Sequence, residues 1–199
     1  MRIGILGGTF DPPHIGHQIL AAEALEQLEL DQVLWMLTPD PPHKRLQKIT
    51  HLKHRQRMVE LAIDCNPGFF LSTVDIDRNP PHYALDTILI LKNQAPQNDY
   101  LYLLGLDSLN DLPTWHKPHD FIKLCYKIVV MLRSGEVLDA SKVEATLPGI
   151  GKKLYFLKTP VIEISGTEIR ARIKKGRQYH YFVPEKVYRY ILKNQLYQD

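Results

Sequence analysis

The pattern of apolar and polar positions along this chain predicts a parallel β-sheet covered by helices. Short, nearly continuous apolar runs read as strands buried on both faces. Between them, apolar residues recur every three or four positions, which is typical of helices packed on a sheet. Strands are expected at 3–6, 32–37, 69–76, 99–104, 126–132 and 153–157, and helices at about 15–28, 51–64, 83–92, 121–125, 165–175 and 184–194.

The alternation of strands and helices predicts an α/β fold, a doubly wound Rossmann-like sheet with helices on both faces. Right-handed crossovers restrict the strand order, and an order of about 3-2-1-4-5 leaves a crevice between strands one and four. Ligands bind such sheets beyond the carboxyl ends of the strands, where the order reverses. The loops after these two strands, 7–11 and 105–108, are the richest in glycine and polar residues. The first helix is expected to bury the face that carries Ile15, Ile19, Ala22, Leu25 and Leu28.

The segment after the first strand carries the most specific chemistry. Gly7-Gly8 predicts a tight turn that a ligand can approach closely, and Pro12-Pro13 stiffens the exit from it. His14 and His17 are three positions apart, so in a first helical turn they share a face. With the N–H groups of a helix start, two imidazoles would face a phosphate. Half of a zinc site is the alternative, but the chain offers no convincing third and fourth ligand.

Size, charge and cysteine content narrow the function classes. At 199 residues with 44% hydrophobic content, one domain over 1–199 is expected, with a helical C-terminal segment at about 165–199. A net charge of +3 falls short of the basic surface of a nucleic-acid-binding protein. Cys65 and Cys125 form no Cys-x-x-Cys motif, and no apolar run approaches about 18 residues. A reduced, cytoplasmic setting is therefore expected, without a signal peptide or a membrane span.

Basic residues gather in two stretches, and each fits either a solvated helix face or a funnel for polyphosphate. They are Lys44, Arg45, Lys48, Lys53, Arg55 and Arg57, and then Arg170, Arg172, Lys174, Lys175 and Arg177.

The string Gly7-Gly8-Thr9-Phe10-Asp11-Pro12-Pro13-His14-Ile15-Gly16-His17 resembles the signature of the bacterial nicotinate mononucleotide adenylyltransferases. These belong to the nucleotidyltransferase superfamily with the His-x-Gly-His motif. The resemblance runs from Met1 to Tyr197 and implies an enzyme of NAD biosynthesis. It would transfer AMP from ATP, entering with Mg²⁺, to nicotinate mononucleotide and release pyrophosphate. His14, His17 and Arg170 would be its catalytic residues.

A second motif lies near the end of the chain, at Ile164-Ser165-Gly166-Thr167-Glu168-Ile169-Arg170. Ser165 is a good N-cap, and Glu168 completes a capping box, which alone would explain both residues. Gly166 in the first turn leaves room for an anion, and Arg170 lies near the same helix end with a forked donor set. The family has a second Ser where this chain has Gly166, so one hydroxyl contact is lost or is replaced by the backbone.

Several segments in the middle of the chain support the resemblance. Lys44 follows Pro41-Pro42-His43 and is either a surface lysine or a cation that reaches a substrate phosphate. The family has Ser-Tyr-Thr where this chain has His82-Tyr83-Ala84, so two hydroxyl contacts are in doubt there. Asp107 would hold ribose hydroxyls, and Trp115 is either a core residue or a face for the pyridine ring.

The resemblance assigns most of these residues to one of two substrates. The ATP-binding residues would be Gly7, Gly8, Thr9, Phe10, His14, His17, Gly105, Asp107, Arg133, Ile164, Ser165, Thr167 and Arg170. The mononucleotide-binding residues would be Thr9, Phe10, Lys44, Tyr83, Ala84, Asp107 and Trp115.

Other functions stay open at this point. Nicotinamide mononucleotide is the alternative acceptor, and another small nucleotidyltransferase or a non-catalytic nucleotide-binding regulator are further alternatives. An aminoacyl-tRNA synthetase shares the His-x-Gly-His string, but this chain lacks the length for an anticodon domain. The expected partners are ATP and a pyridine mononucleotide, with no nucleic acid and no membrane, and a homo-oligomer stays open.

Overall fold

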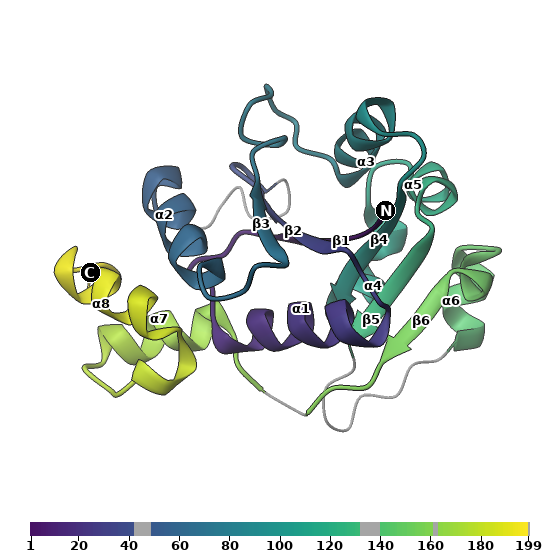
Figure 1. Ribbon diagram of the computed structural model, residues 1–199. Coiled ribbons are helices and arrows are strands. Elements are labelled where there is room, and N and C mark those ends of the chain that lie inside the picture. Colours follow the sequence, from purple (N-terminus) through teal and green to yellow (C-terminus); the bar gives the residue numbers. More distant parts are fainter. Residues whose placement is uncertain (42–48, 132–139, 161–162, 199) are drawn as a thin grey trace.

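A computed structural model describes residues 1–41, 49–131, 140–160 and 163–198 of the chain (Figure 1). Its six strands are β1 (Arg2–Gly8), β2 (Gln32–Leu37), β3 (Phe69–Ser72), β4 (Asp99–Gly105), β5 (Lys127–Met131) and β6 (Leu154–Leu157). Its α-helices are α1 (Ile15–Gln27), α2 (Leu52–Ile63), α3 (Ala84–Gln94), α4 (Leu106–Asp111), α5 (Pro118–Leu124), α6 (Ala140–Thr146), α7 (Gly166–Lys174) and α8 (Glu185–Lys193). Three 3-10 turns are also described, η2 (Leu112–Thr114), η3 (Ile150–Lys152) and η4 (His180–Phe182).

The strands form one parallel sheet in the order β3-β2-β1-β4-β5-β6. The expected order of five strands is confirmed, and β6 extends the sheet beyond β5. The order reverses between β1 and β4, which pair directly from Arg2 opposite Asp99 to Leu6 opposite Leu103. The fold is therefore a doubly wound, Rossmann-like one, and the loops after β1 and β4 meet at one edge of the sheet.

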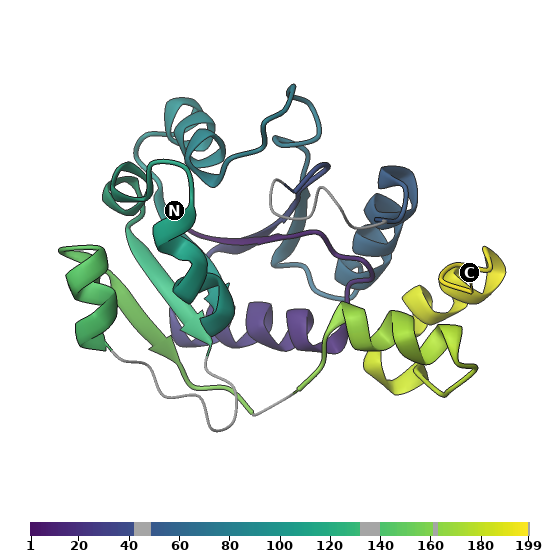
Figure 2. The ribbon, with the colours of Figure 1, turned by 180° about the vertical axis from the view of Figure 1, so that it is seen from behind.

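Side-chain alternation along the strands creates two apolar layers, one on each face of the sheet. On β4, Tyr100, Tyr102 and Leu104 face one layer, while Leu101 and Leu103 face the other. Residues of α3, α4, α5 and α6 complete the first layer, and residues of α1 and α2 complete the second. The ribbon shows α1 crossing one face of the sheet and α3 and α5 lying on the opposite side, from the front and from behind (Figures 1 and 2).

A third apolar cluster joins the C-terminal helices to α2. Met58 and Ala62 of α2 pack with Ile169 of α7 and with Val187 and Ile191 of α8. This packing brings α7 and α8 beside the beginning of α1 (Figure 1). As a result, residues from opposite ends of the sequence lie at the same edge of the sheet.

The predicted inner face of the first helix is wrong. The buried residues of α1 are Gly16, Leu20, Ala21 and Ala24, while Ile15, Ile19 and Leu25 are half-buried and Ala22 is exposed. The small side chains of Ala21 and Ala24 allow the helix to approach the sheet closely, and the larger apolar residues flank this contact.

The turn predicted at Gly7-Gly8 lies further along the chain than expected. Both glycines complete β1, and the chain turns at Phe10, which is buried and has a left-handed φ of 47°. This conformation costs about 1–2 kcal/mol for a residue with a side chain. Ring packing of Phe10 against Trp35, with centroids 5.2 Å apart, and against His17, at 5.0 Å, opposes that cost.

The segment after β4, which sequence reasoning treats as a loop, is helical. Gly105 is the N-cap of α4, and Leu106, Leu109 and Leu112 are all buried. Their three-residue spacing was a signal for this short helix. The predicted third strand ends earlier than expected, at Ser72, because the chain then turns and Asp77 donates to the Thr73 carbonyl at 2.8 Å.

Candidate active site

The two histidines of the first motif lie at the beginning of α1. His14 is the N-cap, and its ring stacks on that of His17 with centroids 3.6 Å apart and planes inclined by 27°. The backbone N–H of His14 donates to Nδ1 of His17 at 3.2 Å. Because Nδ1 of His17 accepts this bond, the neutral His17 ring carries its proton on Nε2. The local structure thus fixes His17 as a hydrogen-bond donor through Nε2.

Gly16, between the two histidines, makes room for this arrangement. A Cβ atom at this position would lie 3.1 Å from Nδ1 and 3.3 Å from Cε1 of His14. Such contacts are tighter than ordinary van der Waals separations, so a side chain would displace the His14 ring. The glycine of the motif therefore sets the position of the first imidazole.

Arg170 of α7 reaches the same place from the other end of the chain. Its Nη1 donates to the backbone carbonyl of Asp11 at 2.7 Å, and Nη2 donates to Oγ1 of Thr167 at 3.3 Å. Gly166 makes a close backbone contact there, since a Cβ atom would lie 2.9 Å from the carbonyl oxygen of Asp11. The structure thus brings Arg170 and the start of α7 to the turn that precedes the two histidines.

The beginning of α7 matches the prediction only in part. Ser165 is the N-cap, and its hydroxyl accepts from the Glu168 N–H at 3.2 Å. The carboxylate of Glu168 pairs instead with Arg172, at 3.0 Å, so the predicted capping box is half formed. An i,i+4 pair with an arginine competes with the return bond to the N-cap.

Asp11 connects the first motif to two distant segments. Its carboxylate is buried and accepts from the Tyr197 hydroxyl at 2.7 Å and from the Thr50 N–H at 3.1 Å. Burial and the negative charge of Asp11 raise the pKa of Tyr197 well above its usual range. The phenol therefore stays protonated and acts as a donor. The sequence motifs assign no such role to Asp11 or to Tyr197.

Arg55 was also misjudged from the sequence. Neither a solvated face nor a polyphosphate funnel describes this residue, because it is 2% exposed. Its nitrogens donate at 2.6–3.0 Å to four backbone carbonyls, which belong to Thr9, Thr38, Pro39 and Thr50. Burial lowers the pKa of Arg55, and the charge of Asp11 opposes this shift. The guanidinium thus ties the turn after β1 to the segments on both sides of 42–48.

Of the residues expected to bind the mononucleotide, Tyr83 and Ala84 lie at the start of α3, and Asp107 and Trp115 lie beyond β4. The ring of Tyr83 stacks on that of His116 with centroids 4.2 Å apart, and His116 directly follows Trp115. Trp115 is half-buried and packs edge-on against Tyr102 at 6.1 Å. A Cβ atom on Gly7 would lie 2.7 Å from the hydroxyl oxygen of Tyr102. This chain of contacts joins the Trp115 region to the end of β1.

The remaining predicted residues are placed as follows. Gly8 completes β1, Thr9 offers its carbonyl to Arg55, and Ala84 opens α3. Asp107 is exposed in the first turn of α4, and Ile164 is half-buried just before α7. Lys44 and Arg133 lie outside the described residues. Among the described residues, no group of three or more His, Cys, Asp or Glu side chains is placed to hold a metal ion.

Comparison with known proteins gives consistent results. Residues 5–172 match the family model described as Cytidylyltransferase-like. The chain is 39% identical over 198 residues to the nicotinate-nucleotide adenylyltransferase of Bacillus subtilis. The alignment covers 100% of this chain and 99% of the relative. The chain is also 39% identical over 196 residues to the probable nicotinate-nucleotide adenylyltransferase of Thermomicrobium roseum, covering 98% of this chain and 91% of the relative.

A solved structure shows the same fold at lower sequence identity. It is the Plasmodium falciparum nicotinic acid mononucleotide adenylyltransferase complexed with NaAD. Its TM-score to this chain is 0.80 at 19% identity, with 98% of this chain and 97% of that chain covered.

Proposed function

The chain belongs to the cytidylyltransferase-like family and, within it, to the nicotinate-nucleotide adenylyltransferases, and from this premise we propose its reaction. The enzyme transfers AMP from ATP to the 5′-phosphate of nicotinate mononucleotide, giving nicotinate adenine dinucleotide and pyrophosphate in NAD biosynthesis. One observation carries the proposal for the site. The two histidines and Arg170 lie at the same turn, around Asp11, although about 150 residues separate His17 from Arg170 in the sequence.

The chemistry asks for donors and alignment rather than for a strong base. An oxygen of the mononucleotide phosphate attacks the α-phosphorus of ATP, and the bond from that phosphorus to the bridging oxygen of pyrophosphate breaks. The attacking group is already an anion, so rate enhancement depends on positioning and on neutralising charge. Nε2–H of His17 and the ring of His14 would donate to the α-phosphate and the bridging oxygen. Arg170 and the turn 165–167 would hold the β- and γ-phosphates.

The nucleotide substrate in this proposal is the Mg²⁺ complex of ATP. Mg²⁺ keeps several waters and binds through phosphate oxygens in such sites, so it requires no dedicated protein cage. The described residues around the two histidines fit this, because they present donors rather than a carboxylate cluster. Lys44 and Arg133 are proposed as further phosphate contacts.

The acceptor would lie between the start of α3 and the Trp115 region. The α3 helix has 11 residues, and its N-cap Tyr83 makes no side-chain capping bond in the described structure. A helix start with its first N–H groups available favours a carboxylate over a neutral amide. This favours nicotinate mononucleotide over nicotinamide mononucleotide, and Asp107 is the proposed contact of the ribose hydroxyls.

A cytoplasmic location, with no nucleic acid or membrane as partner, is part of the proposal. Its support is the class of substrate and the presence of two free cysteines, Cys65 and Cys125, which is common in reducing compartments. Of the helices described, none is both long enough and apolar enough to span a membrane.

Pyrophosphate release tests the proposed function directly. The purified protein is incubated with Mg²⁺-ATP and either nicotinate or nicotinamide mononucleotide, and kcat/KM is compared between the two acceptors. The expected result is rapid release with both ATP and the mononucleotide present, and a higher kcat/KM for nicotinate mononucleotide. ATP binding without release for any mononucleotide would indicate a regulator, and a preference for the amide would correct the acceptor.

A further inference from the structure

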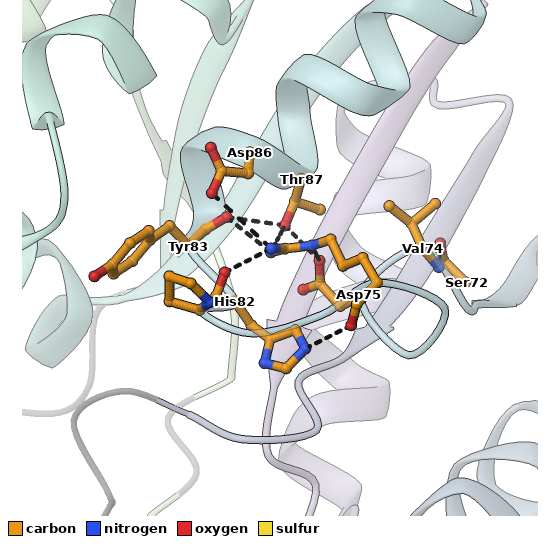
Figure 3. Close-up of polar contacts among 9 residues, drawn as sticks. Ser72, Val74, Asp75, His82, Tyr83, Asp86 and Thr87 are labelled. Carbon is orange, nitrogen blue, oxygen red and sulfur yellow. Dashed lines mark hydrogen bonds and ion pairs between the residues drawn. The ribbon is translucent and has the colours of Figure 1, made fainter.

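A buried polar network joins the turn after β3 to the start of α3 (Figure 3). Asp75 is 3% exposed and Thr87 is fully buried. Oδ1 of Asp75 accepts from Nε of Arg78 at 3.0 Å and from the Thr87 hydroxyl at 2.7 Å. One carboxylate oxygen thus binds a guanidinium from the turn and a hydroxyl from the helix.

The guanidinium of Arg78 extends this network to the backbone before α3. Nη1 donates to the Pro81 carbonyl at 2.6 Å, and Nη2 donates to the Tyr83 carbonyl at 3.2 Å and to Oγ1 of Thr87 at 3.3 Å. The Arg78 carbonyl is itself bound, 3.3 Å from Nε2 of the buried His82. Segment 81–83 is therefore bound to Arg78 through the carbonyls of Pro81 and Tyr83 and through the His82 ring, and dashed lines in Figure 3 mark these bonds.

The start of α3 is held differently from the starts of α2 and α7. In α2 and α7 the N-cap side chain itself accepts a backbone N–H, from Lys53 in α2 and from Glu168 in α7. Tyr83 makes no such bond. The Tyr83 carbonyl accepts the ordinary intrahelical N–H groups of Asp86 and Thr87 and, in addition, Nη2 of Arg78. Arg78 thus adds a donor from outside the helix to the N-cap carbonyl of α3, and in the described structure the N-cap side chain leaves the first N–H groups uncapped.

We propose that Asp75, Arg78 and Thr87 are positioning residues that set the start of α3 for recognition of the acceptor's pyridine carboxylate. This rests on the proposed function, and it names residues that touch the helix rather than the substrate. Small changes in the orientation of Tyr83 and Ala84 would misalign their N–H groups and the Tyr83 ring. The ATP side of the site, around Asp11 and Arg170, shares no hydrogen bond with this network in the described residues.

Thr87→Val is the most direct test, since valine keeps the shape of threonine and removes only the hydroxyl. The KM for nicotinate mononucleotide is expected to rise about tenfold, the scale of one hydrogen bond to a charged group, while the KM for ATP changes less than twofold. Thr87→Ser restores the hydroxyl and is expected to return the mononucleotide KM to within about twofold of the unchanged chain.

Ile88→Val is the matched control, because Ile88 is fully buried in the same helix and lies outside the network. It is expected to lower thermal stability without changing the ratio of the two KM values. Calorimetric binding of nicotinate mononucleotide alone gives a readout independent of turnover. A selective loss of this binding in Thr87→Val supports the positioning role whether or not the wild-type protein releases pyrophosphate. A wild-type protein that releases no pyrophosphate would contradict the proposed function instead.

Three results would overturn the positioning role. Thr87→Val could weaken ATP and mononucleotide binding equally, Ile88→Val could reproduce its effect, or Thr87→Ser could fail to rescue it. Each would reduce the network to general support of the fold.

Discussion

The stacked imidazoles of His14 and His17 show how the start of a helix can orient a hydrogen-bond donor. The N–H of the N-cap residue is bound by Nδ1 of His17, which fixes both the rotation of that ring and the nitrogen that carries the proton. Donors fixed before substrate arrives need no reorganisation in the transition state. In the proposed reaction, the pair would stabilise charge that develops between the α- and β-phosphates.

His17→Ala is expected to lower kcat by about 10²–10³, the usual cost of removing one such donor. The fold should persist, because His17 is only half-buried and Phe10 keeps its packing against Trp35. Steady-state pyrophosphate release and thermal unfolding check the two halves of this prediction. His119→Ala serves as the control, since His119 is an exposed histidine of α5. Near-normal turnover in His17→Ala would contradict the donor role.

Gly16→Ala separates the needs of the helix from those of the site. Alanine usually stabilises a helix by about 0.5–1 kcal/mol relative to glycine. Here its Cβ would press on the His14 ring at 3.1 Å. We expect a melting temperature close to that of the unchanged chain or higher, with kcat/KM lowered about tenfold because the imidazole is displaced by a few tenths of an ångström. A fall in melting temperature with full activity would contradict this.

Residue positions were predictable where a local motif determines them. His14, His17 and Ser165 occupy the expected helix starts, and Arg170 lies beside the first motif. Arg55 and Asp11 could not be assigned, because their partners are carbonyls and hydroxyls that only the tertiary fold brings near. A basic residue in a helical pattern gives no sign of whether it faces solvent or backbone.

At the level of elements, strands were easier to predict than helix faces. Continuous apolar runs such as 128–131 indicate strands buried on both sides, and each expected strand is present within a few residues. The inner face of α1 was missed because apolar residues cover more than one stripe of this helix, so periodicity does not select Ala21 and Ala24. Segment 140–146 was left without an expected element, and its seven-residue helix α6 is too short for a clear pattern.

Arg55 connects α2 to the turn after β1 and to the segment after β2, and Arg55→Lys tests the contribution of these bonds to stability. An ammonium has no planar fork and does not reach four carbonyls at once, so buried acceptors lose their donors. We expect a loss of about 2–4 kcal/mol in the free energy of unfolding, which corresponds to about 5–15 °C in melting temperature. Arg57→Lys is the matched control, since Arg57 lies in the same helix and forms an exposed ion pair with Glu60. Equal melting temperatures of the two variants would contradict the role of Arg55.

At the scale of the whole molecule, both ends of the chain meet at Asp11. Its carbonyl binds Arg170 of α7, and its carboxylate binds the Tyr197 hydroxyl beyond α8. The shared cluster of α2, α7 and α8 supplies the apolar contact that holds these polar bonds together. The proposed catalytic arrangement therefore depends on docking of the C-terminal helices and not on the sheet alone.

Tyr197→Phe removes one donor from the buried Asp11 carboxylate and is expected to cost about 1–2 kcal/mol at neutral pH. The raised pKa of Tyr197 gives this loss a distinctive pH dependence. Above about pH 10 the tyrosine of the unfolded chain loses its proton while that of the folded chain keeps it, so the unfolded state binds fewer protons. Stability of the unchanged chain therefore falls as pH rises, by about 1.4 kcal/mol per pH unit from this group, and the phenylalanine variant lacks this contribution.

The measurement is the difference in unfolding free energy between the two proteins, taken by denaturant titration at pH 7 to 11. Tyr102 and Tyr179, whose pKa values burial also raises, are common to both proteins and cancel in the difference. The difference should be constant up to about pH 10 and then shrink. A difference that is independent of pH throughout would show that the hydroxyl of Tyr197 is not held by Asp11, and that docking of the C-terminal helices relies on their apolar contacts and on the bond from Arg170 to the Asp11 carbonyl.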